Sequence, residues 1–100
     1  MTAAMLLLDW RRTDKGMCVG RAKVRLRNGL EISDIGIFQR GDDRWAALPS
    51  EQIRDTSGQV IRDERGKARY RSPLKWATRE LQDGFSQALI QLIEAERGPL

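Results

Sequence analysis

A run of alternating basic and aliphatic residues is the clearest chemical signal in this sequence. Its basic members are Arg21, Lys23, Arg25 and Arg27. Because successive side chains of a strand point to opposite faces, the alternation predicts a strand with one apolar face and one basic face. Residues two apart lie about 6.6 Å from each other, so the basic row is about 20 Å long. Cations spaced in this way suit contacts with a phosphodiester backbone.

A second set of basic residues repeats the alternation at Lys67, Arg69 and Arg71, with Tyr70 between two of them. Phosphate contact from basic groups and base stacking on aromatic rings are the interactions that hold single-stranded nucleic acid. We therefore expect the two sets to form a nucleic-acid-binding surface, which residues of the adjoining strand extend: Arg11, Arg12 and Lys15. The alternative is a charged face that only interacts with solvent.

The basic surplus lies at the start of the chain. The 100 residues carry 18 Lys and Arg against 14 Asp and Glu, and residues 1–27 hold seven basic residues against two acidic ones. Fourteen of the basic residues are Arg, whose planar guanidinium fits phosphate in a bidentate manner. A GC-rich coding sequence also raises the Arg content, so the asymmetry is the stronger indication of an anionic partner.

Signals of catalysis and metal binding are weak. The chain has no histidine and a single cysteine, Cys18, which excludes Cys/His zinc sites and an internal disulfide. The acidic pairs Asp42-Asp43 and Asp63-Glu64 fall in predicted turns, where Asp is common for backbone reasons. Phosphate-binding and nucleophile motifs are missing. We expect a protein that is not an enzyme and has no metal or cofactor.

Apolar periodicity predicts an α+β fold: an antiparallel sheet of four to five strands followed by one C-terminal helix. The strands are expected at 5–12, 17–27, 30–40 and 45–48, with Leu6, Leu8 and Trp10 on one side of the first. A single domain, 1–100, would comprise a sheet at 4–49, a polar arm at 50–72 and a helix at about 77–97. The segments 59–62 and 67–71 pair in the arm, and no internal repeat is apparent.

Two irregularities are expected where the apolar pattern changes parity. A two-residue loop at Asn28-Gly29 would put Arg and aliphatic side chains on one face, so we predict the three-residue loop 27–29, which sets Arg25 across from Glu31. In the third strand, an extra residue at Ser33-Asp34 restores a common apolar face, which predicts a bulge.

The C-terminal helix is predicted from apolar residues at helical spacing. They are Leu81, Phe85, Leu89, Leu92 and Ile93. Its start is open between Ser72-Pro73 and Thr78, and Gly98-Pro99 ends it.

Two segments, Ile32-Ser-Asp-Ile-Gly-Ile37 and Arg44-Trp-Ala-Ala-Leu-Pro-Ser50, resemble the stage V sporulation protein G family of septation regulators. The resemblance implies a bacterial, dimeric DNA- or RNA-binding regulator of this fold, with contacts near the helix and the loop after Ala47–Ser50. A weaker likeness, to positive-cofactor-four-type coactivators, rests on element order alone: four strands and then a helix.

The leading hypothesis is a small cytoplasmic regulator, homodimeric, that contacts nucleic-acid phosphates through a basic sheet face. No signal peptide or transmembrane segment is apparent, so no membrane partner is expected. The competing hypothesis is a homodimeric protein-interaction module without nucleic acid, in which the helix and the tryptophans Trp10, Trp45 and Trp76 make the contacts.

Overall fold

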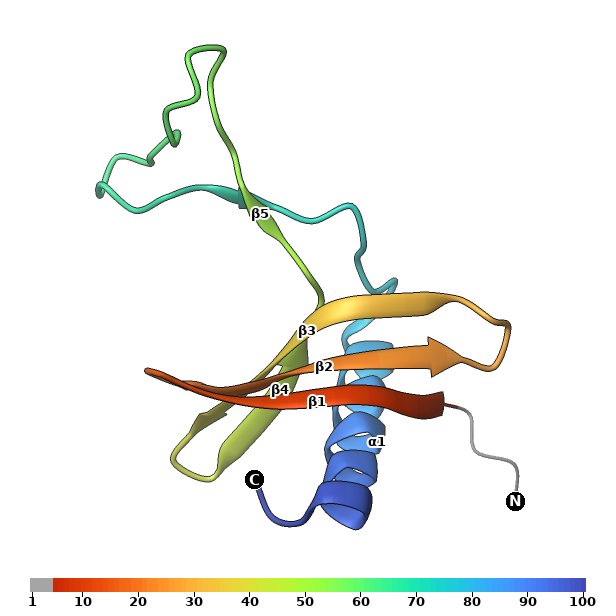
Figure 1. Cartoon of the computed structure of the whole chain (residues 1–100). Helices are drawn as coiled ribbons and strands as arrows, with labels where there is room; N and C mark the ends of the chain where they lie inside the picture. Colours follow the sequence, from red (N-terminus) through yellow and green to blue (C-terminus); the bar gives the residue numbers. More distant parts are fainter. Residues whose placement is uncertain (1–4) are drawn as a thin grey trace.

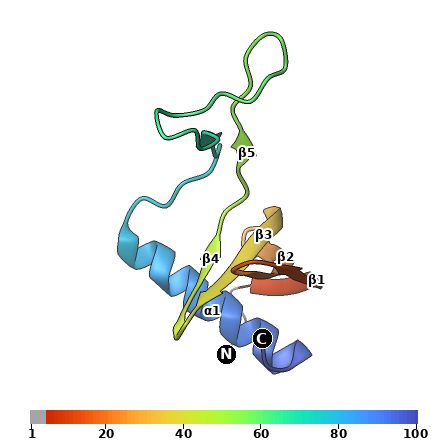
Figure 2. The ribbon, with the colours of Figure 1, turned by 90° about the vertical axis from the view of Figure 1, so that its left-hand side faces the viewer.

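The computed structural model describes residues 5–100. A four-stranded antiparallel sheet, in the order β1–β2–β3–β4, carries one helix, α1 (Arg79–Arg97), on one face (Figure 1). The strands are β1 (Met5–Lys15), β2 (Cys18–Leu26), β3 (Glu31–Arg40) and β4 (Asp43–Ala47). A second sheet of β5 (Glu51–Gln52) and β6 (Tyr70–Arg71) begins an arm that projects from the sheet and helix (Figure 2). The α+β fold is as predicted; residue 4, the first of the expected sheet, lies outside the described residues.

The core lies between α1 and one face of the four-stranded sheet. Ala22 and Val24 of β2 are buried there, whereas Arg21 and Arg25 are exposed. The largest fully buried side chains come from β2, β3 and the helix: Val24, Ile35, Ile37, Leu89 and Ile93. The predicted two-faced strand is therefore confirmed. We call the face opposite α1 the open face.

The helix also covers the outer edge of β4. The buried Ser86 accepts a hydrogen bond from the backbone N–H of Ala46 at 3.0 Å and donates to its carbonyl at 3.4 Å. Arg44 and Glu94 form an ion pair at 3.1 Å between the same two elements. Because an unpaired strand edge is open to other chains, Ser86 gives β4 the partner that a fifth strand would otherwise supply.

The hairpin between β2 and β3 has the predicted three-residue loop. Arg25 pairs with Glu31 and Val24 with Ile32, and the Leu26 N–H donates to the Leu30 carbonyl at 2.7 Å. Gly29 has φ 92°, which favours glycine. Burial of the aliphatic face thus decided the register, as expected.

The predicted bulge in β3 is also present. Ile32 pairs with Val24 and Ile35 with Ala22, so β3 has one residue more than β2 between these pairs. Asp34 in the bulge has φ 58° and is the only non-glycine residue with positive φ in the described part of the chain. Asp tolerates this left-handed region better than most residues because its short side chain bonds locally.

The first strand differs from the prediction. A bulge between Leu7 and Asp9 puts Leu6 and Trp10 on opposite faces, since Leu6 pairs with Arg25 and Trp10 with Ala22. Leu6 is 52% exposed on the open face, and Trp10 is buried against the helix side. The expectation that they share a face was wrong because strict alternation cannot continue through an extra residue.

Two turns are also shorter than predicted. Residues 13–15 belong to β1, whose last residue Lys15 pairs with Cys18, and β4 begins at Asp43, which pairs with Arg40. The turn residues are therefore 16–17 and 41–42. Backbone pairing held these polar residues in strands although their side chains favour turns.

Of the two possible starts for the helix, the structure has Thr78. Its hydroxyl accepts from the Leu81 N–H at 3.2 Å, and Gly98 closes the other end by donating to the Glu94 carbonyl at 3.1 Å. Trp76, just before the cap, packs on Phe85 with ring centroids 4.8 Å apart.

The arm contains an internal repeat, so the expectation of a chain without repeats was wrong. Residues 53–60 read IRDTSGQV and residues 61–68 read IRDERGKA. Each octad forms the same turn: the Asp carboxylate accepts from the backbone N–H groups two and four residues on, at 2.8–3.0 Å. The Arg guanidinium donates to the carbonyl of the following Gly at 2.9 Å in the first octad and 3.0 Å in the second.

Three backbone hydrogen bonds close the arm into a ring. Ile61 donates to Ile53 at 2.8 Å, Arg69 donates to Ile61 at 2.9 Å, and Ile53 donates to Arg69 at 2.8 Å. These three residues are spaced eight apart, one repeat length. The predicted pairing of 59–62 with 67–71 is thus one of two hairpins, because the bridge between Arg54 and Val60 adds the other.

Candidate nucleic-acid interface

Three of the predicted contact residues, Arg21, Lys23 and Arg25, lie on the open face of β2. Glu31 on β3 accepts from Arg25 at 2.8 Å and lies 3.7 Å from Lys23. The hydrogen bond and charge of Arg25 hold the pKa of Glu31 below its ordinary value. Glu31, predicted to lie across from Arg25, thus reaches Lys23 as well.

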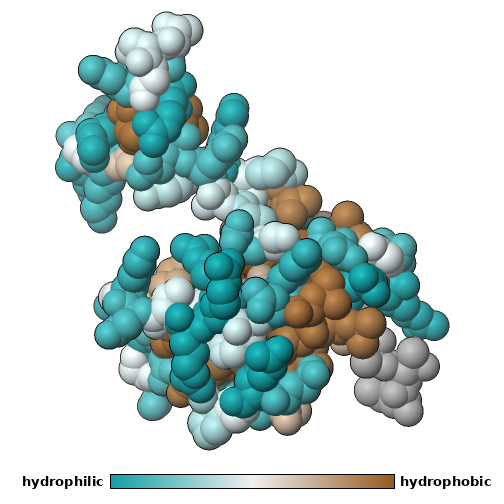
Figure 3. All heavy atoms as spheres, in the orientation of Figure 1, coloured by the Kyte–Doolittle hydropathy of each residue, from teal (hydrophilic) through white to brown (hydrophobic). Residues whose placement is uncertain are grey.

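The other predicted residues are spread over the hairpin and the arm. Arg27 follows β2, in the hairpin turn. Lys67 and Arg69 lie in the arm between β5 and β6, and Arg71 forms an ion pair with Glu51 at 3.1 Å. The two basic sets therefore do not make one continuous row. Figure 3 shows hydrophilic side chains over both the sheet and the arm, with an apolar area near the start of β1.

A cavity of about 340 Å³ lies where β1 and β2 run toward their turn. We call it the basic cavity; its lining consists of Arg11, Arg12, Thr13, Lys15, Cys18 and Arg21. Four of these residues are cations and none is a carboxylate. Arg11 and Arg21 are direct partners across the strands, and Arg11 also lies 3.4 Å from Asp9. This arrangement suits a bound anion, because like charges placed opposite each other in a sheet repel.

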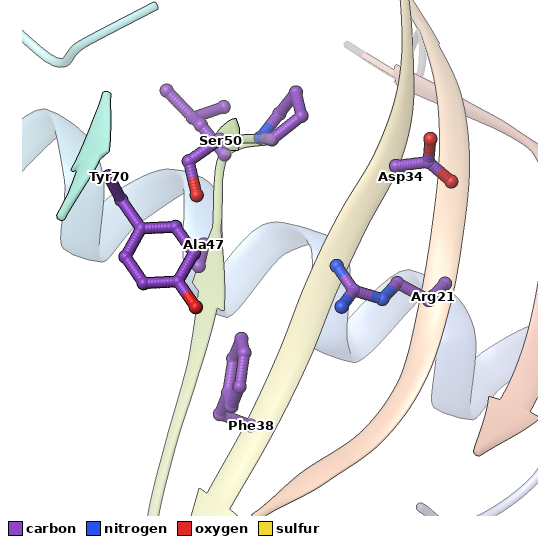
Figure 4. Close-up of a pocket in the computed structure, with 8 residues that line it drawn as sticks. Arg21, Asp34, Phe38, Ala47, Ser50 and Tyr70 are labelled. Atoms are coloured by element: carbon purple, nitrogen blue, oxygen red, sulfur yellow. The ribbon is translucent and has the colours of Figure 1, made fainter. Parts of the chain in front are cut away.

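A second cavity, of about 420 Å³, lies on the open face below the start of the arm. We call it the aromatic cavity; its lining consists of Arg21, Asp34, Phe38, Ala47, Leu48, Pro49, Ser50 and Tyr70. In Figure 4 the Tyr70 ring from the arm, the Phe38 ring from the sheet and the Arg21 guanidinium surround one opening, and the Asp34 carboxylate lies at its rim, pointing toward β2 and away from the rings.

The rings of the aromatic cavity are held from outside it. Phe38 stacks on Trp45 of β4, with centroids 5.7 Å apart and planes 11° apart. Tyr70 accepts a hydrogen bond from the Gln52 amide at 3.2 Å, yet it is 59% exposed. Because Trp45 stacks on Phe38, it lies on the open face, and it is not one of the buried core residues.

Gly36 keeps the floor between these side chains clear. A Cβ there would lie 2.7 Å from the Phe38 ring and 3.3 Å from an Arg21 guanidinium nitrogen. A larger residue would therefore push the ring or the cation out of its position.

Arg21 lines both the basic cavity and the aromatic cavity, so the two cavities adjoin at its side chain. Of the predicted contact residues, the structure brings Arg21 and Tyr70 together. Sequence reasoning did not identify Phe38 or Asp34 as site residues. The signal was available, since the predicted bulge moves residues 36 and 38 to the same face as Arg21.

No protein-family model matches the chain, and neither a curated protein nor a solved structure shows significant similarity to it. The resemblance to the stage V sporulation protein G family therefore stays a prediction. Within residues 5–100, no helix is long and apolar enough to cross a membrane. The same residues contain no group of three or more Cys, Asp or Glu side chains placed to hold a metal ion.

Proposed function

We propose that this protein is a non-enzymatic regulator that binds single-stranded nucleic acid on the open face of its sheet. Phosphates occupy the basic cavity, and an unstacked base occupies the aromatic cavity. The observation that carries this proposal is that Arg21 lines both cavities. The phosphate and the base of neighbouring nucleotides in one nucleic-acid strand can then occupy the two cavities at once.

The aromatic cavity favours a single strand over a duplex. Its rings come from different elements, Phe38 from β3 and Tyr70 from β6. A base reaches such rings only when it is unstacked from its neighbours, as in single strands and loops. Stacking on an aromatic side chain is worth about 1–3 kcal/mol per base.

The basic cavity supplies the electrostatic part of binding. Arg21 has no carboxylate within 4 Å among the described residues, in contrast to Lys23 and Arg25, which share Glu31. A phosphate between Arg11 and Arg21 removes their mutual repulsion and releases counterions from the nucleic acid.

Fluorescence anisotropy tests the proposal with labelled 12-nucleotide DNA and RNA strands and the matching duplex. With three to four phosphates neutralised, log K for the single strands should fall against log salt with a slope of about −2 to −3. Arg21→Gln should weaken binding at least tenfold. Arg79→Gln, which removes the same charge from an exposed helix site paired with Asp83, should not. Absence of binding at 50 mM salt, or equal losses in both variants, would exclude this function.

A second candidate is the homodimeric interaction module, favoured by exposed aliphatic residues beside the edge strand β1. Leu6 is 52% and Leu30 50% exposed, and β1 ends the strand order of the four-stranded sheet. A second copy that pairs along β1 would cover Leu6. Sedimentation velocity of the wild type and Leu6→Ser decides this: a dimer that dissociates in the variant supports it, and a monomeric wild type excludes it.

A further inference from the structure

We propose that Asp34 makes the aromatic cavity selective for guanine. This inference rests on the proposed function and adds to it the identity of the base. The bulge in β3 sets a carboxylate at the rim of a cavity that also holds a guanidinium and two aromatic rings, and guanine is the base whose edge complements that set.

The position of Asp34 is the first part of the evidence. Asp34 lines the aromatic cavity with Arg21, Phe38 and Tyr70, and its carboxylate lies at the rim on the side of β2 (Figure 4). It forms no ion pair within 4 Å among the residues that the structure describes, although Arg21 lines the same cavity. Both oxygens are therefore available to donors of a bound ligand.

The chemistry of the bases provides the second part. A carboxylate accepts hydrogen bonds only, and its two oxygens are best filled by two adjacent donors. Guanine offers N1–H and the N2 amino group side by side on its Watson–Crick edge. Its O6, next to N1–H, is an acceptor that a guanidinium such as Arg21 can reach.

The other bases fit less well. Adenine and cytosine each offer one amino group beside a ring nitrogen whose lone pair repels a carboxylate. In thymine and uracil a single N–H lies between two carbonyl oxygens. Each of them gives Asp34 one hydrogen bond where guanine gives two, so the contact is weaker than the bidentate one.

The size of the site agrees with this reading. A cavity of about 420 Å³ lies in the range of small-ligand sites, so a base enters without large rearrangement. The rings supply sequence-independent stacking, and the hydrogen bonds of the edge supply the selectivity.

A purely structural role for Asp34 is the opposing explanation, since Asp suits φ 58° in a bulge. Asp34→Asn separates the two. Asparagine tolerates the same backbone and keeps one acceptor, but it replaces the second with a donor that opposes guanine N1–H or N2–H. Asp42→Asn in the turn before β4 is the matched control, because it removes an equal charge at the end of β3, from a residue that does not line the cavity.

The test uses the full chain and four labelled heptamers, thymine-rich with one central G, A, C or T. We expect the G strand to bind at least about fivefold more tightly than the others, the low end for one bidentate contact. Asp34→Asn should abolish that preference with its thermal midpoint retained, and Asp42→Asn should keep it.

The outcomes separate the two proposals. Equal binding of all four strands, or a preference that survives Asp34→Asn, overturns guanine selectivity while leaving strand binding intact. Failure of every strand to bind overturns the proposed function itself. Guanosine 5′-monophosphate alone is the last arm: if it binds as tightly as the G strand, the cavity belongs to a free nucleotide and the strand assignment is wrong.

Discussion

Arg11 and Arg21 face each other directly across β1 and β2, and both stand on the open face of the sheet. Opposed like charges weaken an antiparallel pair. On the same face, Lys23 and Arg25 have a carboxylate partner in Glu31. Arg21 has no ion-pair partner among the described residues, so its charge next to Arg11 weakens the pairing of β1 with β2.

The first prediction separates binding from stability at this position. Arg21→Gln should change the free energy of unfolding by no more than about 0.5 kcal/mol, because the residue is exposed and its loss removes a repulsion. Its affinity for single strands should nevertheless drop. Urea unfolding and anisotropy on the same samples check this, and a parallel loss of stability and affinity would contradict it.

Ser86 should be important for stability although it lies on a helix among apolar residues. Ser86→Ala leaves the backbone N–H and carbonyl of Ala46 unpaired in a buried site, which should cost about 1–3 kcal/mol. Gln87→Ala, one position along on the exposed side of α1, is the control and should be nearly neutral. Urea unfolding distinguishes them; similar midpoints would argue against an edge-covering role.

Two glycine-to-alanine substitutions should change the free energy of unfolding in opposite directions. A Cβ at Gly20 would overlap the buried Trp10 ring, so Gly20→Ala should cost about 1–3 kcal/mol through overpacking. Gly84 in the exposed part of α1 has nothing within 4 Å of that position, so Gly84→Ala should stabilise by about 1 kcal/mol. Thermal unfolding of the two variants checks the pair, and a stabilising Gly20→Ala would refute the proposed contact.

The ion pair between Arg25 and Glu31 should be visible in the pH dependence of stability. Because folding lowers the pKa of Glu31, its contribution is present above the unfolded-state pKa and is lost as the pH falls through the folded-state pKa. Arg25→Gln should move the pKa of Glu31 back up toward its ordinary value, since the largest cause of the shift is gone. Carboxyl ¹³C NMR titration measures this; an unchanged pKa would mean that Lys23 suffices.

The turns of the two octads should open independently of each other when one of their Asp acceptors is removed. Asp63→Ala removes the acceptor of two backbone N–H groups, those of Arg65 and Lys67, in the second turn only. Amide hydrogen exchange should speed up around that turn and at Arg69, while Ser57 and Gln59 keep their bonds to Asp55. Uniform acceleration over the whole arm would show instead that the ring of three hydrogen bonds opens as one unit.

The order of strands and helix, the two-faced character of β2 and the three-residue hairpin could all be predicted from the sequence. Each follows from local alternation together with the burial of one face, as for Val24 opposite Ile32. The same rule failed at Leu6 because residues 6–8 are all leucine, so the change of parity at the bulge between Leu7 and Asp9 does not appear in the apolar pattern. The octads of the arm were missed because two copies of eight residues lie below the length of the repeats usually sought.

The sequence by itself determined which residues turn inward, which turn outward, and that cations dominate the outward set. Only the tertiary structure decided which of those cations remain without a partner. Glu31 reaches both Lys23 and Arg25, whereas Arg21 lies between the basic cavity and the rings of Phe38 and Tyr70. The physical reason is that alternation is a property of neighbouring residues. Ion pairing depends instead on strand register, and the approach of Tyr70 to Phe38 depends on how the arm returns to the sheet 49 residues after Arg21.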